Sequence, residues 1–178
     1  MIKITRLSHE EIFLIAEIEA MSNVLESATR LTGMRFAAIS HMTETHWTAC
    51  AVRDELQFSI NVGDSLDIEK TLCGALRINP RPIIIESISN DSDCLGHDFP
   101  KLYGFESFVS LPIVFLDGSL FGSLCMLDYL PKRNDDPRVV DILTGIVRLF
   151  SIALELRQIG GCLASFNKAP YLKGKWES

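Results

Sequence analysis

An Asp-Gly pair between two strand-like segments constrains the fold of this chain more than any other feature of its sequence. The segments Ser107–Phe115 and Ser119–Asp128 are rich in β-branched and aromatic residues, and Asp117-Gly118 separates them. Asp-Gly between strand-like residues is the strongest short-range signal for a β-hairpin. The sequence therefore predicts an antiparallel hairpin in the second half of the chain.

Helical periodicity marks both ends of the strand-like region. In the segment 8–32, apolar residues recur at intervals of four and three, which predicts an N-terminal helix. Ser8 and Glu11 form a capping box at its start, and Gly33 is a stop signal at its end. The apolar positions of this predicted helix are Leu14, Ile18, Met21, Leu25 and Ala28.

A second helix is predicted over 137–158, and it carries two apolar stripes. Ile142, Leu149 and Leu156 are seven residues apart and lie off the first stripe, so this helix is apolar on more than one side. Such a helix needs two neighbours, and we expect a parallel homodimer to bury its second stripe together with the segment 14–28. The first stripe consists of Val139, Leu143, Ile146, Phe150 and Ala153.

Between these helices, the segment 35–128 is predicted to form a sheet with inserted helices and a loop. Asp residues begin a short helix over 67–78, and Asn79-Pro80 ends it. A polar loop follows over 87–100, and a loop of this length inside a compact domain is usually functional or mobile. The predicted strands are Arg35–Met42, His46–Arg53, Pro82–Glu86, Ser107–Phe115 and Ser119–Asp128. This order predicts an α+β fold with terminal helices on one face of an antiparallel sheet.

Composition excludes several classes of protein. The chain has 178 residues, of which 47% are apolar and 22% charged, and these values predict one folded globular domain. A formal charge of −6 without any Lys/Arg cluster argues against nucleic acid as a partner. The five cysteines, at positions 50, 73, 94, 125 and 162, show no paired spacing, so we expect a reducing, cytoplasmic setting.

Membrane insertion is not expected either. The longest uninterrupted apolar stretch is Leu111–Leu116, which is far shorter than the roughly 18 residues needed to span a bilayer. Glu10 and Glu11 arrive before any apolar run can build, so the N-terminus does not resemble a signal peptide.

Three stretches of the sequence point, in their order, to one family. The first is Gly63–Leu66 followed by Thr71-Leu72-Cys73, the second is Pro100–Ile113, and the third is Asp117–Asp128. In these stretches the chain resembles the GAF domains of bacterial histidine kinases and related signalling proteins.

The resemblance implies a fold and a role. In such domains a central antiparallel sheet carries the terminal helices on one face and a ligand pocket, roofed by helices and loops, on the other. Here the domain would span residues 1–159 with a tail over 160–178, and the pocket roof would come from 67–78 and 87–103. The expected role is sensory: the domain binds a small molecule or partner and relays the signal to a kinase or another output domain. Family members bind cyclic nucleotides, tetrapyrroles, haem or small metabolites, so the ligand or cofactor stays open.

Alternation along the predicted hairpin gives the residues expected to face the pocket. Phe108, Ser110 and Pro112 share one face, and their mixture of an aromatic ring, a hydroxyl and a proline is typical of a ligand face. The opposite face carries the aliphatic residues Val109, Leu111 and Ile113, which are suited to packing under helices. The further candidate ligand-binding residues are Trp47, Cys73, His97, Phe99 and Tyr103, each of which also suits plain core or loop packing.

An enzymatic role is the first alternative. Cys73-Gly74 resembles one position of the free methionine-(R)-sulfoxide reductases, a GAF lineage that uses cysteines for catalysis, and Cys94 and Cys125 are further candidates. An attacking cysteine needs a lowered pKa and a resolving partner, whereas Cys73 falls inside the predicted helix rather than at its start. The Cys-Asp and Ser-Glu pairs of the reductases are replaced here by Tyr103–Ser107. A buried cysteine that acts as a small hydrophobe is the competing interpretation.

A bilin pigment is the second alternative, because Asp98-Phe99-Pro100 followed by Tyr103 resembles a phytochrome segment. The Cys-His pair that marks covalent attachment in many photoreceptors is absent, since Cys94 lies three residues before His97 rather than next to it. These two residues are also too few to form a metal site. No nucleophile, base and orienting group can be assembled from the sequence, so we expect a domain without catalysis of its own.

Overall fold

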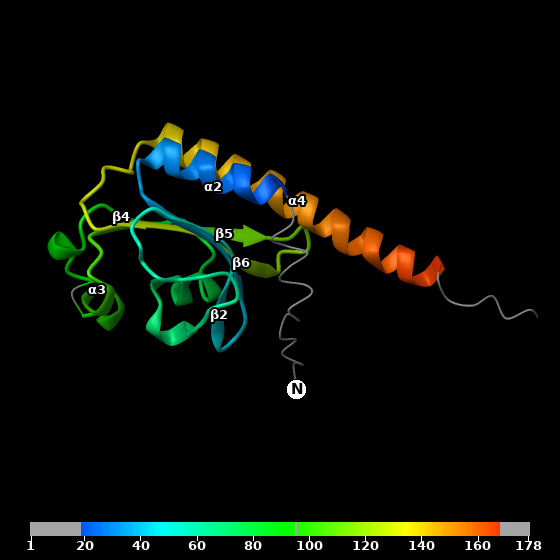
Figure 1. Ribbon diagram of the computed structural model, residues 1–178, viewed down its shortest axis with the longest axis horizontal. Helices are drawn as coiled ribbons and strands as arrows, with labels where there is room; N and C mark the ends of the chain where they lie inside the picture. Colours follow the sequence, from blue (N-terminus) through cyan, green and yellow to red (C-terminus); the bar gives the residue numbers. More distant parts are fainter. Residues whose placement is uncertain (1–18, 95, 168–178) are drawn as a thin grey trace, which may run out of the picture.

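The computed structural model describes residues 19–94 and 96–167, with 158–167 as backbone only. Its centre is a six-stranded antiparallel sheet in the order β3-β2-β1-β6-β5-β4 (Figure 1). The strands are β1 (Phe36–Met42), β2 (His46–Asp54), β3 (Ser65–Asp67), β4 (Ile83–Ile85), β5 (Ser107–Val114) and β6 (Leu120–Asp128). The α-helices are α2 (Glu19–Thr32), α3 (Asp98–Tyr103) and α4 (Pro137–Asn167), and the 3-10 helices are η1 (Ile68–Lys70), η2 (Leu72–Arg77) and η3 (Ile88–Asn90).

The predicted hairpin is confirmed, and it joins β5 to β6. At its turn the N–H of Ser119 donates to Asp117 Oδ1 at 2.8 Å, and Gly118 has a φ of 85°, which a residue without a side chain adopts at little cost. Because β6 also pairs with β1, the hairpin places β6 in the middle of the sheet.

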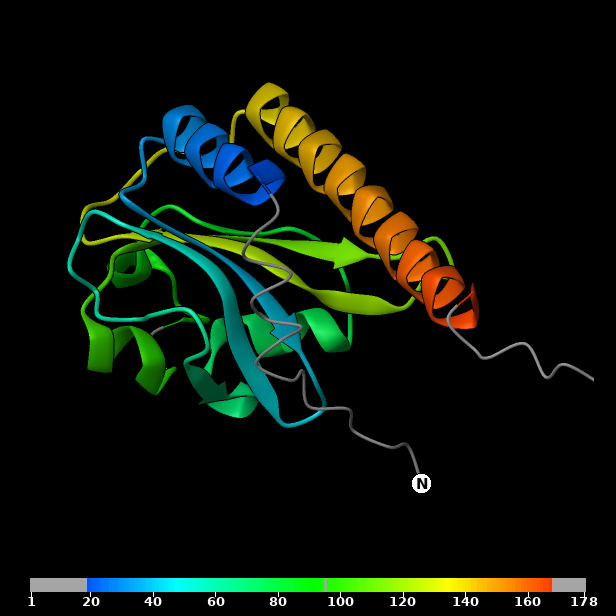
Figure 2. The ribbon, with the colours of Figure 1, turned by 45° about the vertical axis from the view of Figure 1, so that its right-hand side comes forward.

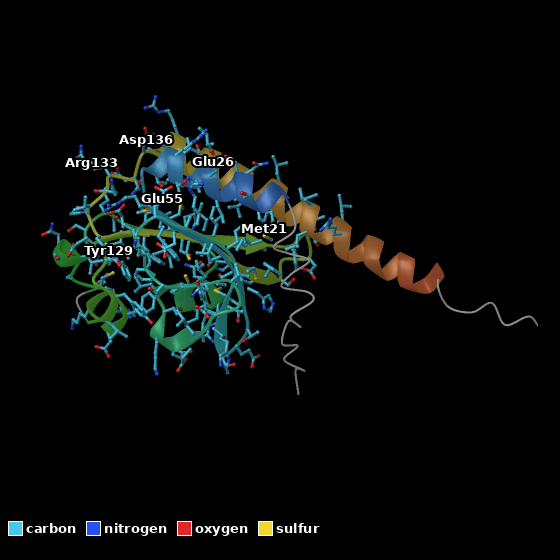
Figure 3. All side chains as sticks on the ribbon, viewed as in Figure 1. Met21, Glu26, Glu55, Tyr129, Arg133 and Asp136 are labelled. Atoms are coloured by element: carbon cyan, nitrogen blue, oxygen red, sulfur yellow. The ribbon has the colours of Figure 1, made fainter. Side chains whose placement is uncertain are left out.

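The terminal helices α2 and α4 cover one face of the sheet, as predicted (Figures 1 and 2). Their apolar side chains pack with those of the central strands in one cluster, which we call the helix-side core. Met21, Leu25 and Ala28 of α2 are buried there, and Figure 3 shows Met21 at the α2 end nearest the middle of α4. Leu14, Ile18 and the predicted capping box of Ser8 and Glu11 lie outside the described residues.

Helix α4 differs from its prediction in length and in phase. It continues to Asn167, past the expected end at Gln158, because one or two glycines only weaken a helix, by about 1 kcal/mol each. Its sheet-facing residues are Leu143, Val147, Phe150 and Leu154, whereas Ala153, predicted to face the sheet, is exposed. Residues seven positions apart are rotated by about 20° relative to each other around a straight α-helix. Over two heptads this rotation turns Ala153 away from the sheet.

The other face of the sheet is covered by short elements rather than by the single helix predicted over 67–78. Here β3 ends at Asp67, which caps η1 by accepting a hydrogen bond from the N–H of Glu69 at 3.1 Å. Thr71 then interrupts the helix in an extended conformation, and its hydroxyl donates to the carbonyl of Ile68 at 2.9 Å. A side chain that bonds nearby backbone in this way competes with continuous helix, so η1 and η2 form separately.

The segment predicted as a loop over 87–100 contains η3 and the start of α3. Gly104 ends α3 with a φ of 71°, and its N–H donates to the carbonyl of Pro100 at 2.7 Å. This left-handed glycine is a common helix stop, and Pro100 is tolerated because it lies in the first turn.

A buried ion pair fastens the end of β6 to the start of β1. Both oxygens of the fully buried Asp128 accept hydrogen bonds from the Arg35 side chain, at 2.6 and 2.9 Å, and Oδ1 also accepts one from the N–H of Leu130 at 2.9 Å. Burial by itself would raise the pKa of Asp128, but these hydrogen bonds from Arg35 and Leu130 hold the pKa below its ordinary value.

Replacing this carboxylate should destabilise the fold in a pH-dependent way. We expect Asp128→Asn to lower the free energy of unfolding at pH 7 by about 1–3 kcal/mol, because the half-exposed Arg35 side chain and the N–H of Leu130 lose a buried, charged acceptor. A lowered folded-state pKa contributes stability above the unfolded value of about 3.9, and this contribution disappears as pH falls through the folded value. Urea unfolding should therefore show a smaller difference between the two proteins at pH 3 than at pH 7.

The control is Asp136→Asn, at the start of α4 (Figure 3). Asp136 caps α4 by accepting from the N–H of Arg138 at 2.9 Å, and it is only half-buried. Asparagine caps helices equally well, so this variant should unfold like the wild type. A difference for Asp128→Asn that stays constant from pH 7 to pH 3 would contradict the assigned role of the ion pair.

Candidate functional site

The face of the sheet opposite α2 and α4 carries a second apolar cluster, the pocket-side core. It lies between the sheet and a roof formed by η1, η2, α3 and the connecting loops (Figure 2). A cavity of about 20 Å³ remains inside it. The cavity is lined by Phe36, Trp47, Phe58, Ile60, Leu66, Thr71, Leu72, Cys73, Phe99, Phe108, Cys125 and Leu127.

Six of the eight candidate ligand-binding residues gather at this cavity. Trp47, Cys73, Phe99 and Phe108 line it directly. Ser110 lies beside them, since its hydroxyl is 3.4 Å from the sulfur of Cys73. Tyr103 packs its ring on that of Phe99, with the ring centres 4.6 Å apart. Phe108 lies on this face and Val109, Leu111 and Ile113 lie in the helix-side core, as strand alternation predicts.

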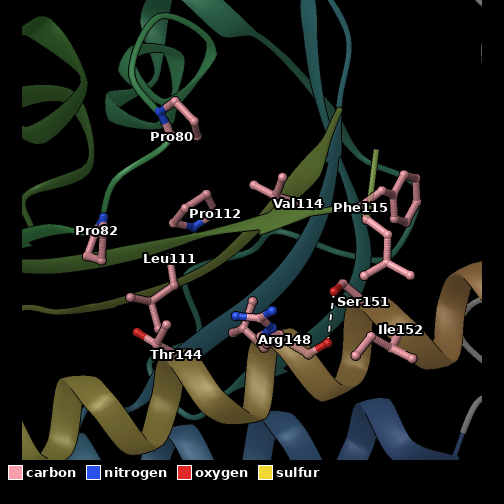
Figure 4. A pocket seen from close by; sticks show the side chains of 12 residues that line it. Pro80, Pro82, Leu111, Pro112, Val114, Phe115, Thr144, Arg148, Ser151 and Ile152 are labelled. Atoms are coloured by element: carbon pink, nitrogen blue, oxygen red, sulfur yellow. Dashed lines mark hydrogen bonds between the residues drawn. The ribbon is translucent and has the colours of Figure 1, made fainter. Parts of the chain in front are cut away.

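The other two candidates lie elsewhere. His97 borders a separate surface pocket of about 300 Å³ between η1 and α3, together with Asp67, Glu69 and Lys70. Pro112 lines an open groove of about 360 Å³ between β5 and α4, where Pro80 and Pro82 face Thr144 and Arg148 (Figure 4).

The short strand β4 explains the position of Pro112. Ile83 of β4 pairs with Ser110, so the part of β5 beyond Ser110 has no neighbouring strand on that side. Proline, which lacks a backbone N–H, is tolerated at such an edge. Pro112 therefore borders the sheet edge rather than the cavity, a distinction that alternation along a single strand does not make.

Next to the cavity, small polar side chains of the sheet surround the sulfur of Cys73 and form a polar centre. The sulfur of Cys73 lies 3.4 Å from the hydroxyl of Ser110 and 3.6 Å from that of Ser123, and the Ser123 hydroxyl is 3.0 Å from that of Ser40. Cys125 is directly opposite Ser110 in the β5–β6 ladder, and so it adjoins the same centre.

Cys73 and Cys125 influence each other's ionisation. The pKa of Cys73 is lowered from its ordinary value, chiefly by a hydrogen bond with Cys125 and further by the hydroxyls of Ser110 and Ser123, against the opposing effect of burial. The same hydrogen bond, followed by burial, raises the pKa of Cys125. The two hydroxyls at 3.4 and 3.6 Å from its sulfur make Cys73 the better stabilised thiolate of the two.

The position of Cys73 also differs from its prediction. The break at Thr71 makes Cys73 the second residue of η2 instead of an interior residue of a longer helix. A Cβ atom on the next residue, Gly74, would lie 2.8 Å from the carbonyl oxygen of Ile68. Only glycine permits this close approach of η2 to η1, which brings the Cys73 side chain over the strands.

Trp47 contributes a donor without an acceptor. Its indole N–H is buried and makes no hydrogen bond with the residues that the structure describes. Tryptophan N–H groups usually find a partner when buried, and each exception calls for an explanation. Because Trp47 and Cys73 line the same cavity, a negatively charged sulfur or a ligand acceptor there would be favoured by this donor.

The sequence analysis did not identify Phe58, which is central to the aromatic wall. Its ring packs against Phe36 and Tyr103, with ring centres 5.0 and 5.2 Å apart. The neighbouring residues Gln57 and Ser59 have φ values of 56° and 68°, a backbone conformation that is uncommon for residues other than glycine. The local sequence gives no signal for this conformation, and so Phe58 could not be assigned to the site.

Cys94 shows the opposite electrostatic character to Cys73. Burial, followed by the nearby carboxylates of Asp91 and Asp93, raises the pKa of Cys94 to about 11. The N–H of His97 donates to the carbonyl of Cys94 at 3.0 Å, which places both residues in one turn. Within residues 19–94 and 96–167, no group of three His, Cys, Asp or Glu side chains is arranged to hold a metal ion.

None of the helices among the described residues combines the length and apolar character needed to cross a membrane. Among curated protein sequences, none is similar enough to this chain to count as a match.

Solved structures share the fold at low sequence identity. A domain of a Sinorhizobium meliloti protein described as a two-component sensor histidine kinase is 17% identical, with a TM-score of 0.59, over 84% of this chain and 98% of that one. The blue-light absorbing GAF domain of PixJ from Thermosynechococcus elongatus is 14% identical, with a TM-score of 0.67, over 91% and 98%. The chromophore-binding domain of a bacteriophytochrome from R. palustris is 12% identical, with a TM-score of 0.66, over 88% and 64%.

The sequence itself matches a family model. The model describes the GAF domain, and it matches residues 17–154. This range includes the whole sheet, the roof elements, α2 and α4 as far as Leu154. With this match and the same fold in the solved structures, the chain belongs to the GAF domain family.

Proposed function

We propose that this chain is a cytoplasmic sensory domain that catalyses no reaction itself. It binds a small molecule on the pocket side and relays occupancy, through a homodimer of its terminal helices, to a kinase or another output domain. The observation that carries the proposal is an apolar stripe on α4 that nothing in the described part of the chain covers.

This α4 stripe consists of Ile142, Leu149 and Leu156, whose side chains are 50%, 71% and 64% exposed. Isolated exposed leucines are common on protein surfaces, but three large apolar residues at heptad spacing form a continuous seam. A second copy of the chain supplies the complementary seam, since a two-fold axis brings the same stripe from each protomer together. Figure 2 shows that α4 runs well beyond the sheet, which leaves room for a partner helix along its length.

Ligand binding requires the roof to move. Pockets for small molecules usually have volumes of about 300–1,000 Å³, whereas the cavity between the roof and the sheet holds about 20 Å³. The roof consists of the short elements η1, η2 and α3, which are joined by loops. Such segments open at lower free energy than long helices in a packed core, so a ligand that favours the open form can displace them.

The hairpin connects the two faces of the domain. Phe108 and Ser110 of β5 face the cavity, whereas Leu111 and Ile113 pack in the helix-side core. At the end of the hairpin, the backbone N–H of Leu116 donates to the carboxylate of Glu155 on α4, at 3.1 and 3.2 Å. A ligand that shifts β5 from the pocket side therefore acts on α4 through direct contacts.

The dimer can be tested on the α4 stripe. Leu149→Glu should raise the dimer dissociation constant by at least about 100-fold, because each interface would then bury two carboxylates without partners. Sedimentation velocity over a concentration series measures this change. Leu102→Glu is the control, since Leu102 of α3 is 77% exposed and lies on the pocket side, so that variant should dimerise normally. Wild-type protein that sediments as a monomer at micromolar concentration would refute the homodimer.

The ligand can be tested on Trp47. A thermal-shift screen with purines, indoles and other planar compounds that carry a hydrogen-bond acceptor should raise the unfolding midpoint of the wild type. Trp47→Phe should weaken binding of such a compound by about tenfold, because one hydrogen bond is lost while the ring remains. Trp176→Phe makes the same substitution outside the described residues and serves as the control.

Two results of this screen would favour other functions. If no compound raises the midpoint, the pocket is filled by its own side chains and the domain only dimerises, an interpretation that the 20 Å³ cavity also supports. Visible absorption of the purified protein would instead indicate a bound pigment, such as the chromophore named for the phytochrome relative.

A further inference from the structure

Two of the cysteines that the structure describes line the same small cavity. Cys73 belongs to the roof and Cys125 to the floor. The Cys73 sulfur lies 3.4 Å from the hydroxyl of Ser110 and 3.6 Å from that of Ser123. Ser110 is directly opposite Cys125 on the neighbouring strand β5. Ser123 precedes Cys125 by two residues on β6, so both side chains lie on the same face of the sheet. This arrangement places the sulfur of Cys73 over the strand position that Cys125 occupies.

We propose that Cys73 and Cys125 form a disulfide when a peroxide enters the cavity, and that this bond fastens the roof to the sheet. The inference requires neither a ligand nor a dimer, so it stands independently of the proposed sensory function.

The chemical environment distinguishes these two thiols from the others. Cys73 has a lowered pKa, whereas burial raises the pKa of Cys50 to about 12 and that of Cys94 to about 11. Thiolates rather than thiols attack peroxides, so Cys73 is the preferred nucleophile. The hydroxyls of Ser110 and Ser123, at 3.4 and 3.6 Å from its sulfur, favour its charged form.

The cavity has a size suited to the smallest oxidants. A void of about 10–15 Å³ is enough for one water molecule, and this one holds about 20 Å³. Hydrogen peroxide is only slightly larger than water, whereas larger oxidants would require the roof to open. The buried position of both sulfurs therefore selects for a small oxidant instead of excluding oxidation.

The reaction balances in two steps. The Cys73 thiolate attacks one peroxide oxygen, the O–O bond breaks, and the departing hydroxide takes up the proton that the thiol released, which gives a sulfenic acid and water. Cys125 then loses its proton and attacks the sulfur of Cys73, an S–S bond forms, and the hydroxide that leaves becomes a second water. The two sulfurs together lose two electrons, and hydrogen peroxide gains them.

Oxidation of Cys73 makes the following attack by Cys125 easier. The hydrogen bond to the Cys73 sulfur is the largest cause of the raised pKa of Cys125. Once Cys73 is a neutral sulfenic acid, the negative charge that held the proton on Cys125 is gone. Cys125 then deprotonates more readily, next to the sulfur that it must attack.

The closing experiment maps the disulfide in the full chain. The protein is treated with hydrogen peroxide, alkylated without reduction, digested and analysed by mass spectrometry. We expect one linked pair of peptides that contains Cys73 and Cys125 and is lighter by two hydrogen atoms than the reduced pair. The crosslink should also raise the unfolding midpoint by on the order of 5–10 °C, and dithiothreitol should reverse this rise.

Variants separate the two roles. Cys125→Ser should stop at the sulfenic acid of Cys73, which dimedone traps, whereas Cys73→Ser should leave Cys125 unreacted. Cys94→Ser is the matched control, because Cys94 is buried in the same core and should not affect the crosslink. The wild-type map decides the question even if a variant fails to fold. Free thiols at Cys73 and Cys125 after peroxide treatment, or a link from Cys73 to Cys94, would overturn the proposal.

Discussion

The central strands β1 and β6 are buried on both faces, and the rest of the domain depends on this constraint. Almost every residue of these two strands is inaccessible, so each strand must supply side chains to two cores at once. Leu124 and Met126 of β6 pack under α2 and α4, whereas the intervening Cys125 faces the cavity. Gly122 marks the tightest point, since a Cβ atom there would lie 1.8 Å from the carbonyl oxygen of Ser40. Neither core can be rearranged without an effect on the backbone of the other.

The two cores differ in chemistry, and the difference supports the roles proposed for them. The helix-side core is dominated by aliphatic residues and methionines that pack long helices. The pocket-side core combines aromatic rings with thiols and hydroxyls, and it is covered by elements of three to six residues. Closely packed aliphatic side chains transmit displacement, whereas a roof of short segments opens at lower free energy. The same sheet therefore has one face suited to recognition and one suited to relay.

The sequence predicted the elements whose signals are local. The Asp117-Gly118 turn and the periodicity around Met21–Ala28 were enough for the hairpin and for the helix that covers the sheet. The helix predicted over 67–78 was wrong because a hydrogen bond from the Thr71 hydroxyl, which composition does not reveal, divides it. Pro112 was predicted to face the pocket together with Ser110, because alternation along β5 predicts which face of the sheet a residue lies on. Alternation does not predict that β4 ends opposite Ser110 and leaves Pro112 at the sheet edge. Cys125 was weighed with Cys73 and Cys94 as a candidate thiol, but the sequence could not place it at the same cavity as Cys73, because that depends on how the roof packs on the sheet.

The backbone on either side of Phe58 has a consequence for the opening of the pocket. Gln57 and Ser59 both adopt positive φ, which costs a residue with a side chain about 1–2 kcal/mol. Two sets of contacts maintain this conformation. The ring of Phe58 packs among Phe36, Tyr103 and Phe105, and the N–H of Ser59 donates to the carboxylate of Asp54 at 3.1 Å. A movement of Phe58 out of the cavity would let this backbone relax, so the released strain would offset part of the packing energy that is lost.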